Sequence, residues 1–283
     1  MSLRVDIRHP GTPASVPFQT AMGTVVSRDV RLEAGGILMQ EVARVMEAEG
    51  CESGVIVLDG MAMGPYRYVG PDRSTDGIHA AWYSALRAGE AARIQAGTAI
   101  VGRRDGDWWL HAHAVWDEVG CGARAGHLLP DEVTLSEGAN VTLHAFTGGV
   151  FDVSLNEETQ FPVFHPTGGQ DSGNAVIAKV NPHHDISACI LQIASDAGFR
   201  SARVFGVGSL IGAEFTDGST AMISSISEVF VMQDAYVDSG EITVPMYCVD
   251  PEAGHFSGPL APGKSPVCVT FELLMIEDPP GQA

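Results

Sequence analysis

Lysine is nearly absent from this chain of 283 residues, which has only Lys179 and Lys264 and carries 16 basic residues against 35 acidic ones. The formal net charge at pH 7 is therefore −19. Proteins that bind nucleic acid draw much of their affinity from Lys and Arg side chains that neutralise phosphates. The one adjacent basic pair is Arg103 and Arg104, so there is no basic cluster and we expect no binding to nucleic acid.

Long apolar runs, a signal peptide and paired cysteines are missing as well. No apolar run approaches the roughly 20 residues of a membrane-spanning helix, and residues 1–20 lack the apolar stretch of a secretory signal. The five cysteines are odd in number and form no CxxC pair, which favours reduced thiols over a disulfide framework. We therefore expect a cytoplasmic protein without membrane contact, whose 45% hydrophobic content suffices for a large core.

What the chain does contain is an internal repeat. Residues 36–69 align without gaps on residues 184–217, and each segment begins with apolar residues at helical spacing and then reaches a glycine. A strand-like run follows the glycine in both segments. A Gly-His pair recurs later in the same order, at His127 and His255. The repeat predicts two diverged copies of one structural unit.

The predicted fold is α/β (α+β), with two diverged copies of a mostly antiparallel sheet flanked by helices. We place the first copy at residues 1–166, a polar, glycine-rich linker at residues 167–175 and a degenerate second copy at residues 176–283. Residues 78–97 are rich in alanine and are interpreted as a helix present only in the first copy.

Three histidines of the first copy form a candidate metal site. His111 and His113 lie in the apolar, aromatic run WWLHAHAVW, and in a strand such residues share one face with their bases about 6.6 Å apart. His127 follows a glycine-rich stretch that allows the chain to fold back. Three imidazoles with an open fourth position are typical of catalytic zinc, so we predict zinc, or another divalent transition metal, at this site. Ordinary histidines in a half-buried sheet are the alternative.

Two further expectations concern the surroundings of this site. In the second copy His255 persists, whereas Met246 and Cys248 replace the strand histidines. Such a trio can bind a soft metal, but we interpret it as a decayed site kept for packing. The carboxylates nearest in sequence to the three histidines are expected to hold their rings in place, namely Asp117, Glu118 and Glu132.

The run HAHAVWDEVGCGARAGHLLPDE, which follows a helix–strand unit, resembles the PPC domain. This is the plants and prokaryotes conserved domain, which accompanies AT-hooks in plant nuclear proteins and stands alone in bacteria. The first copy matches the family pattern over residues 18–166, and the second copy matches it without the HxH pair. The resemblance implies a small α/β domain, assembly into trimers and metal on these histidines. The chain lacks an Arg-Gly-Arg-Pro hook, so DNA binding is not carried over.

The family's fold is also similar to that of acetolactate decarboxylase, which holds zinc with an HxH pair and a further histidine. The resemblance therefore implies a metal-dependent enzyme, a decarboxylase or a hydrolase acting on a small polar substrate, within a homo-oligomer. The alternative is a non-catalytic regulatory or binding protein in which the metal is structural. A deep pocket that opens on the three histidines would favour the enzyme.

Overall fold

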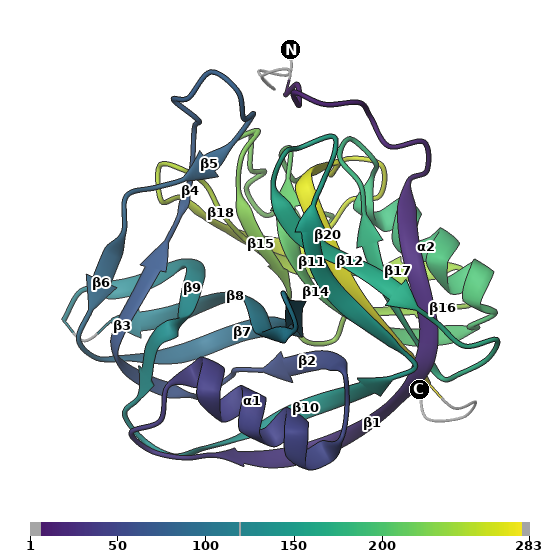
Figure 1. The fold of residues 1–283 in the computed structure, drawn as a ribbon. Helices are drawn as coiled ribbons and strands as arrows, with labels where there is room; N and C mark the ends of the chain where they lie inside the picture. The colour runs from purple at the N-terminus through teal and green to yellow at the C-terminus, as the bar shows by residue number, and fades with distance from the viewer. Residues whose placement is uncertain (1–6, 119, 279–283) are drawn as a thin grey trace.

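The structure is a computed structural model that describes residues 7–118 and 120–278 (Figure 1). Strands make up 56% of the chain and helices 9%. Its described part contains two helices, α1 (Leu38–Glu49) and α2 (Ile186–Ala197), and neither has the length and apolar character needed to cross a membrane. The fold is therefore dominated by antiparallel sheet, and the expectation of sheets flanked by helices holds only in part.

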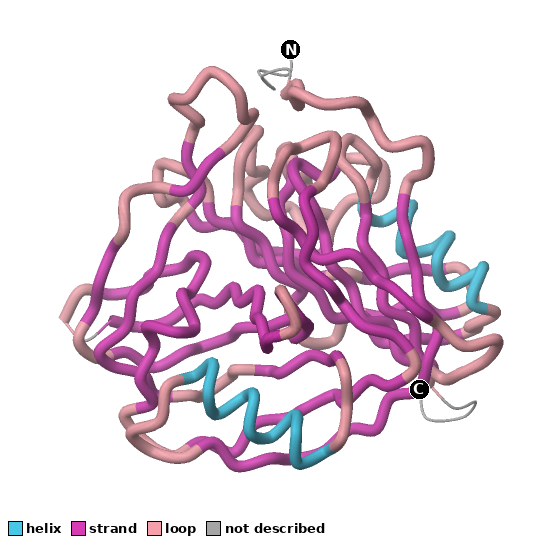
Figure 2. The backbone as a smooth tube through the Cα atoms, in the orientation of Figure 1, coloured by secondary structure: helices cyan, strands magenta, loops and turns pink. Residues whose placement is uncertain are grey.

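The elements are arranged in four layers, helix, sheet, sheet and helix. Figure 2 shows the two helices at the periphery, with the strands between them. One buried cluster joins α1 to the first sheet, a second joins α2 to the second sheet, and a third lies between the sheets. This third core, with Ile100 and Phe146 from the first half and Phe230 and Leu274 from the second, holds the two halves together.

The first sheet is formed mainly by the first half of the chain. Its strands are β1 (Phe18–Leu32), β2 (Ser53–Val57), β3 (Ala62–Val69), β6 (Arg87–Gly89), β7 (Ala92–Arg104), β8 (Asp107–Glu118), β9 (Gly122–Leu135), β10 (Ala139–Thr147), β11 (Gly149–Leu155) and β12 (Pro162–Gly168). The neighbours run in the order β1-β10-β2-β7-β8-β9-β3, and all of these pairings are antiparallel. A small separate hairpin joins β4 (Pro71–Asp72) to β5 (Trp82–Tyr83).

The second sheet follows the glycine-rich stretch after β12. Its strands are β13 (Ala175–Val180), β14 (Ser201–Leu210), β15 (Glu228–Val231), β16 (Tyr236–Asp238), β17 (Glu241–Thr243), β18 (Pro245–Val249), β19 (His255–Pro259) and β20 (Val267–Glu277). The neighbours run in the order β13-β20-β14-β15-β18-β19. The first residues of β1 pair with β13, and its later residues pair with β10, so β1 belongs to both sheets.

The two helices occupy equivalent places in the two halves. Both were expected from apolar spacing, and α2 begins and ends 148 residues after α1. Each ends at a glycine in the left-handed conformation, Gly50 with φ 63° and Gly198 with φ 74°, a conformation that glycine adopts without steric cost. The strands that follow them, β2 and β14, also begin 148 residues apart.

The helix expected at residues 78–97 is wrong, because this segment forms β5, β6 and the beginning of β7. Alanine content is a weak predictor of helix when strand partners are available. Here a Cβ atom at Gly89 would lie 2.2 Å from the Tyr66 ring, and one at Gly97 would lie 2.7 Å from Ala114. The two glycines therefore allow the close packing of strands that residues 78–97 require.

Alternation along β8 places the candidate site between the two sheets. Leu110 and Ala112 pack in the core on the α1 side, whereas Val115 belongs to the core between the sheets. Side chains two residues apart in a strand share a face. His111 and His113 therefore point away from α1 and toward the second half of the chain.

Candidate metal centre

The structure brings the three predicted histidines together. His111 and His113 lie on β8, and His127 lies on the antiparallel neighbour β9, directly opposite His113. The Nε2 atoms of His111 and His113 are 3.0 Å apart, and His113 Nε2 is 3.3 Å from His127 Nδ1. The antiparallel pairing of β8 with β9 therefore brings His127 back beside the first two histidines, as predicted.

A fourth ligand comes from the second half of the chain, where sequence reasoning did not find it. Glu228, at the start of β15, places its Oε2 atom 2.8 Å from His113 Nε2. The ligand atoms of His111, His113, His127 and Glu228 all lie within 4.8 Å of one another. These four residues can hold a metal ion, and both halves of the chain contribute to the set.

Hydrogen bonds on the far side of two rings determine where their lone pairs point. His113 Nδ1 donates to the carbonyl oxygen of Val229 at 2.8 Å, and His111 Nδ1 lies 2.9 Å from Glu272 Oε2. A carbonyl or carboxylate oxygen accepts, so each neutral ring carries its proton on Nδ1 and a lone pair on Nε2. Those two lone pairs then face each other at 3.0 Å, which is repulsive unless a proton or a metal ion lies between them.

The spacing of the ligand atoms also suits a metal. Metal–nitrogen distances of about 2.0–2.1 Å in a tetrahedron imply ligand–ligand distances of about 3.3 Å. The observed separations around His113 Nε2 are 3.0 Å to His111, 3.3 Å to His127 and 2.8 Å to Glu228. Imidazole nitrogens with one carboxylate oxygen are a donor set that zinc accepts. The residues present therefore fit a divalent transition metal.

The surroundings shift the pKa values of His111 and His127 in opposite directions. Burial lowers the pKa of His111, but the charge and hydrogen bond of Glu272, together with Glu228, raise it to a net value above 6.5. Burial, with His111 and His113 nearby, lowers the pKa of His127 well below 6.5. His127 is therefore neutral at pH 7, as a metal ligand must be.

Glu272, which contacts His111, is itself fixed by burial and by a hydrogen bond. It lies on β20, is fully buried, and accepts a hydrogen bond from the Thr270 hydroxyl at 2.8 Å. Lys179 lies directly opposite on β13 and is also fully buried. Burial lowers the pKa of Lys179 to about 8, while Glu272 acts to raise it. A buried cation thus balances the carboxylate that orients His111.

The carboxylates expected to orient the rings lie elsewhere, so that expectation is wrong. Asp117 accepts a hydrogen bond from the Gln95 side chain. Glu118 forms an ion pair with Arg124, and the exposed Glu132 forms one with Arg67. Nearness in sequence misled here because Asp117 and Glu118 lie beyond the histidines on β8, where the strand reaches solvent. The orienting groups are Glu272 and the Val229 carbonyl, both from the second sheet.

Met246, Cys248 and His255 do not come together as a site. Met246 and Cys248 are fully buried on the α2 side of β18, whereas His255 is exposed. The Tyr247 hydroxyl lies 2.6 Å from His255 Nδ1, so His255 is on the side of β18 that faces away from Cys248. Residues 246 and 248 are part of a hydrophobic core, in line with the interpretation of a decayed site.

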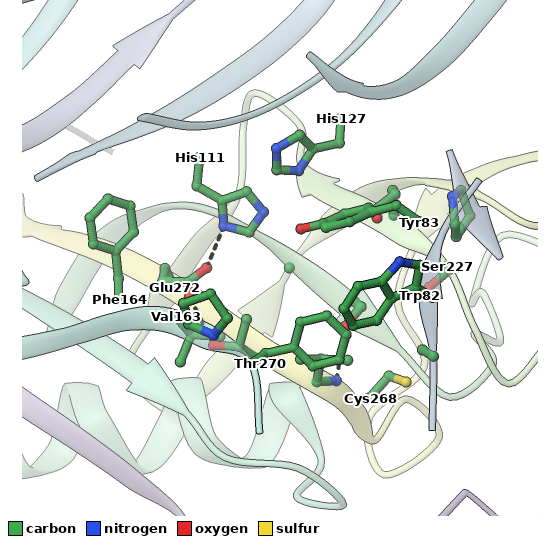
Figure 3. Close-up of a pocket in the computed structure, with 18 of the residues that line it drawn as sticks. Trp82, Tyr83, His111, His127, Val163, Phe164, Ser227, Cys268, Thr270 and Glu272 are labelled. Atoms are coloured by element: carbon green, nitrogen blue, oxygen red, sulfur yellow. Dashed lines mark hydrogen bonds and ion pairs between the residues drawn. The ribbon is translucent and has the colours of Figure 1, made fainter. Parts of the chain in front are cut away.

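A pocket of about 250 Å³ lies beside the histidines, between the two sheets. Figure 3 shows His111 and His127 on one side of it, with Glu272 joined to His111 by a dashed line. Thr270, Trp82, Val163 and Phe164 also line the pocket. Glu228 lines the pocket as well. Three of the four ligand residues are therefore accessible to a small molecule in the pocket, whereas His113 is 1% exposed.

Tyr83, which sequence reasoning also missed, points its hydroxyl into this pocket. Figure 3 shows the hydroxyl turned toward His111 and His127, and the Tyr83 ring centroid is 5.2 Å from that of His127. Burial of the hydroxyl, with Glu228 and Glu272 nearby, raises the pKa of Tyr83. The hydroxyl is therefore a protonated donor at pH 7, although 41% of the residue is exposed to solvent.

No sequence family and no curated protein matches this chain. Solved structures do resemble it. A plant- and prokaryote-conserved (PPC) protein from Pyrococcus horikoshii is 16% identical, with a TM-score of 0.42, over 51% of this chain and 94% of its own. Structural neighbours of this chain thus include PPC-domain proteins, as the sequence resemblance predicted.

Two other solved structures are similar to the same extent. A metal-containing protein from Archaeoglobus fulgidus is 18% identical, with a TM-score of 0.40, over 51% of this chain and 97% of its own. A candidate DNA-binding protein from Ralstonia eutropha is 15% identical, with a TM-score of 0.38, over 50% of this chain and 96% of its own. In each case nearly the whole neighbour corresponds to about half of this chain.

Proposed function

We propose that this protein is a metal-dependent enzyme that acts on a small molecule, with zinc held by His111, His113, His127 and Glu228. The observation that carries the proposal is the convergence of these four ligand atoms within 4.8 Å beside a pocket of about 250 Å³. A closed structural zinc site would be sealed by its own ligands. Here a pocket reaches the ligands, which favours catalysis over a purely structural role.

Bound zinc would polarise a carbonyl group or activate a water molecule. The Tyr83 hydroxyl can donate a hydrogen bond to a substrate oxygen on which negative charge develops. Glu228 is a metal ligand in this proposal, so a substrate oxygen would be a fifth ligand of the zinc, a coordination number that catalytic zinc can reach. Glu272 touches no substrate in this scheme and holds the His111 ring in position. These roles suit decarboxylation or hydrolysis, because both reactions build negative charge on an oxygen atom.

The test is to load the metal-depleted protein with zinc and to follow product formation from 2-keto acids, 2-hydroxy-3-keto acids, esters and amides. We expect turnover of one of these classes that requires the metal. Tyr83→Phe should retain the metal and lower kcat by about 10²-fold, the usual cost of one lost donor. A protein that binds zinc and small ligands but turns over none of these classes would instead be a binding or regulatory protein.

Nucleic-acid binding is a role that we do not propose for this chain. Its net charge is −19, and no cluster of basic side chains lines the pocket, where Arg104 is the single basic residue apart from the histidines. Phosphate backbones would be repelled by such a surface on average.

A further inference from the structure

We infer that the ligand of this pocket is a small organic acid with a ring in its apolar body, which binds the metal through oxygen atoms at one end and pairs with Arg104 at the other. This inference rests on the proposed metal site and names its substrate class. It differs from the small polar substrate expected from the sequence. Its basis is the order in which metal ligands, aromatic rings and an unpaired guanidinium follow one another along the pocket.

The wall of the pocket beyond the histidines is aromatic. Trp82 and Phe161 lie with their ring centroids 5.1 Å apart, and Trp109 and Phe164 line the same space. Aromatic residues make up 7% of the chain, so their gathering around one small pocket is selective. Trp82 is 44% exposed, which leaves part of its ring free to contact a ligand. Flat apolar faces of this kind favour a ring in the bound molecule.

The geometry of β7 and β8 sets the order of these groups. Trp109 and His111 are two residues apart on β8 and share a face, so their bases are about 6.6 Å apart. Arg104 lies at the end of β7, opposite Asp107, and its Cζ atom is 4.7 Å from the centroid of the Trp109 ring. The metal ligands, the indole and the guanidinium therefore follow one another in a line.

Arg104 is available for an anion. Within residues 7–118 and 120–278 it forms no ion pair with a carboxylate and no hydrogen bond, and its contact is with the Trp109 ring. The residue is half-buried, and a guanidinium pairs with a carboxylate through two parallel hydrogen bonds. In a chain of net charge −19, an unpaired arginine at a pocket favours a negatively charged ligand.

At the end of the pocket beside the histidines, an anionic ligand can bind only when the metal is present. Glu228 and Glu272 both line it, and they would repel a carboxylate or any other anionic oxygen group. A divalent cation offsets these two charges and supplies the centre to which the oxygen atoms bind. The Tyr83 hydroxyl, turned toward the same place (Figure 3), then donates to one of those oxygens.

The experiment measures the affinity of three hydroxamates for the zinc-loaded protein by calorimetry and by tryptophan fluorescence. All three bind metals through the same two oxygens, but acetohydroxamate has no ring, benzohydroxamate has one, and 4-carboxybenzohydroxamate adds a carboxylate at the far end. We expect benzohydroxamate to bind about 10-fold or more tightly than acetohydroxamate, because its ring is removed from water. The 4-carboxy compound should bind more tightly still, and none of the three should bind the metal-free protein.

Two variants test which residues cause the preference for a ring and the preference for a carboxylate. Arg104→Met should remove the advantage of the 4-carboxy compound and keep the preference for benzohydroxamate. Phe161→Ala should reduce the preference for the ring and leave acetohydroxamate binding unchanged. Equal affinities for the three hydroxamates, or a carboxylate advantage that survives Arg104→Met, would overturn the inference while the metal site stands. If the protein takes up no zinc before any hydroxamate is added, the proposed function itself fails and the inference falls with it.

Discussion

Several residues of this site act by holding a neighbouring side chain in position. His111 touches the pocket, but Glu272 determines which of its nitrogens carries the proton and therefore which lone pair can bind a metal. Glu272 in turn is fixed by Thr270 and is opposite the buried Lys179. The site thus depends on a chain of contacts that runs from the first sheet into the second.

Replacing Glu272 by Gln tests this dependence. The amide retains a hydrogen-bonding oxygen but loses the negative charge that makes His111 a better ligand, so we expect zinc affinity to fall by about 10- to 100-fold. Competition against a fluorescent zinc chelator measures the change. Glu132→Gln is the matched control, because Glu132 pairs with Arg67 at the surface. An equal loss of affinity in both variants would show that the effect is not specific to the ring contact.

His144 provides a pH-dependent prediction at the same scale. Burial and the nearby Arg203 lower its pKa to about 4, and the residue is 3% exposed. Between pH 6.5 and 4 the unfolded chain therefore binds a proton at this position that the folded chain does not. The free energy of unfolding should fall as the pH falls through this window, by up to about 1.4 kcal/mol per pH unit from this residue.

The variant His144→Gln isolates that contribution. Its free energy of unfolding, measured with urea at pH 7 and at pH 5, should decrease less on acidification than that of the wild type. The comparison uses the difference between two pH values, so any constant cost of losing the Ser27 contact cancels. Parallel pH profiles for the two proteins would mean that His144 is not the buried neutral group described here.

The sequence was sufficient to predict part of this site and not the remainder. His111, His113 and His127 lie within 17 positions of one another, and strand geometry places the first two on one face. Glu228 and Glu272 come more than 100 residues later, and no local pattern joins them to the histidines. Glu272 did carry a signal, because it is the one carboxylate in the apolar run VCVTFELLMI, where an unpaired charge would be costly.

Among the elements, the two helices were predictable because each has apolar residues at helical spacing and a terminal glycine. They differ at their starts. The Asp185 side chain caps α2, accepting from Ala188 N at 3.0 Å, from Gly263 N at 3.1 Å and from Ser265 N at 3.0 Å. The start of α1 has no side-chain cap, since Ile37 stands there. Asp185 thus ties α2 to the loop before β20.

Asp185→Ala should therefore lower the free energy of unfolding by about 2 kcal/mol, more than a simple cap, because three backbone amides lose their acceptor. Chemical denaturation followed by circular dichroism measures this loss. Asp196→Ala in the last turn of the same helix is the control, since Asp196 is exposed and, among the described residues, its side chain bonds to Gln192 alone. A change within about 0.5 kcal/mol is expected there. Equal losses in the two variants would rule out the capping role.

The strands at residues 78–97 show why alanine content alone predicted the wrong secondary structure there. Alanine stabilises helices by a few tenths of a kilocalorie per residue, roughly, whereas β7 gains hydrogen bonds with β8 along nearly its whole length. Such pairing depends on residues 107–118, which a local window does not include. The strand β8 itself was predictable because residues 108–116 are mostly apolar and aromatic, and strand geometry then placed His111 and His113 on one face.

At the scale of the whole molecule, the interface between the two sheets is where the site forms. The first sheet brings three histidines, and the second brings Glu228, Glu272 and the Val229 carbonyl. Either half of the chain alone would therefore lack part of the set. The buried residues shared by the two sheets keep these groups at fixed positions, which a preorganised site requires.

Assembly of whole chains is a separate proposal, based on the family resemblance. We expect a homo-oligomer built on trimers, and light scattering coupled to gel filtration at micromolar concentration should give a multiple of the 29.8 kDa chain mass. A mass near 29.8 kDa alone would contradict this proposal. It would leave the site unaffected, because one chain supplies every residue of the set.

The central claim is that a metal ion lies among His111, His113, His127 and Glu228, and elemental analysis of two purified proteins tests it most directly. The wild type should contain about one equivalent of a divalent transition metal, zinc in our proposal. His113→Ala should contain almost none, while its circular dichroism spectrum stays that of a folded protein, because the cores on the two helix sides do not include His113. Equal metal content in the folded wild type and the folded variant would contradict the account.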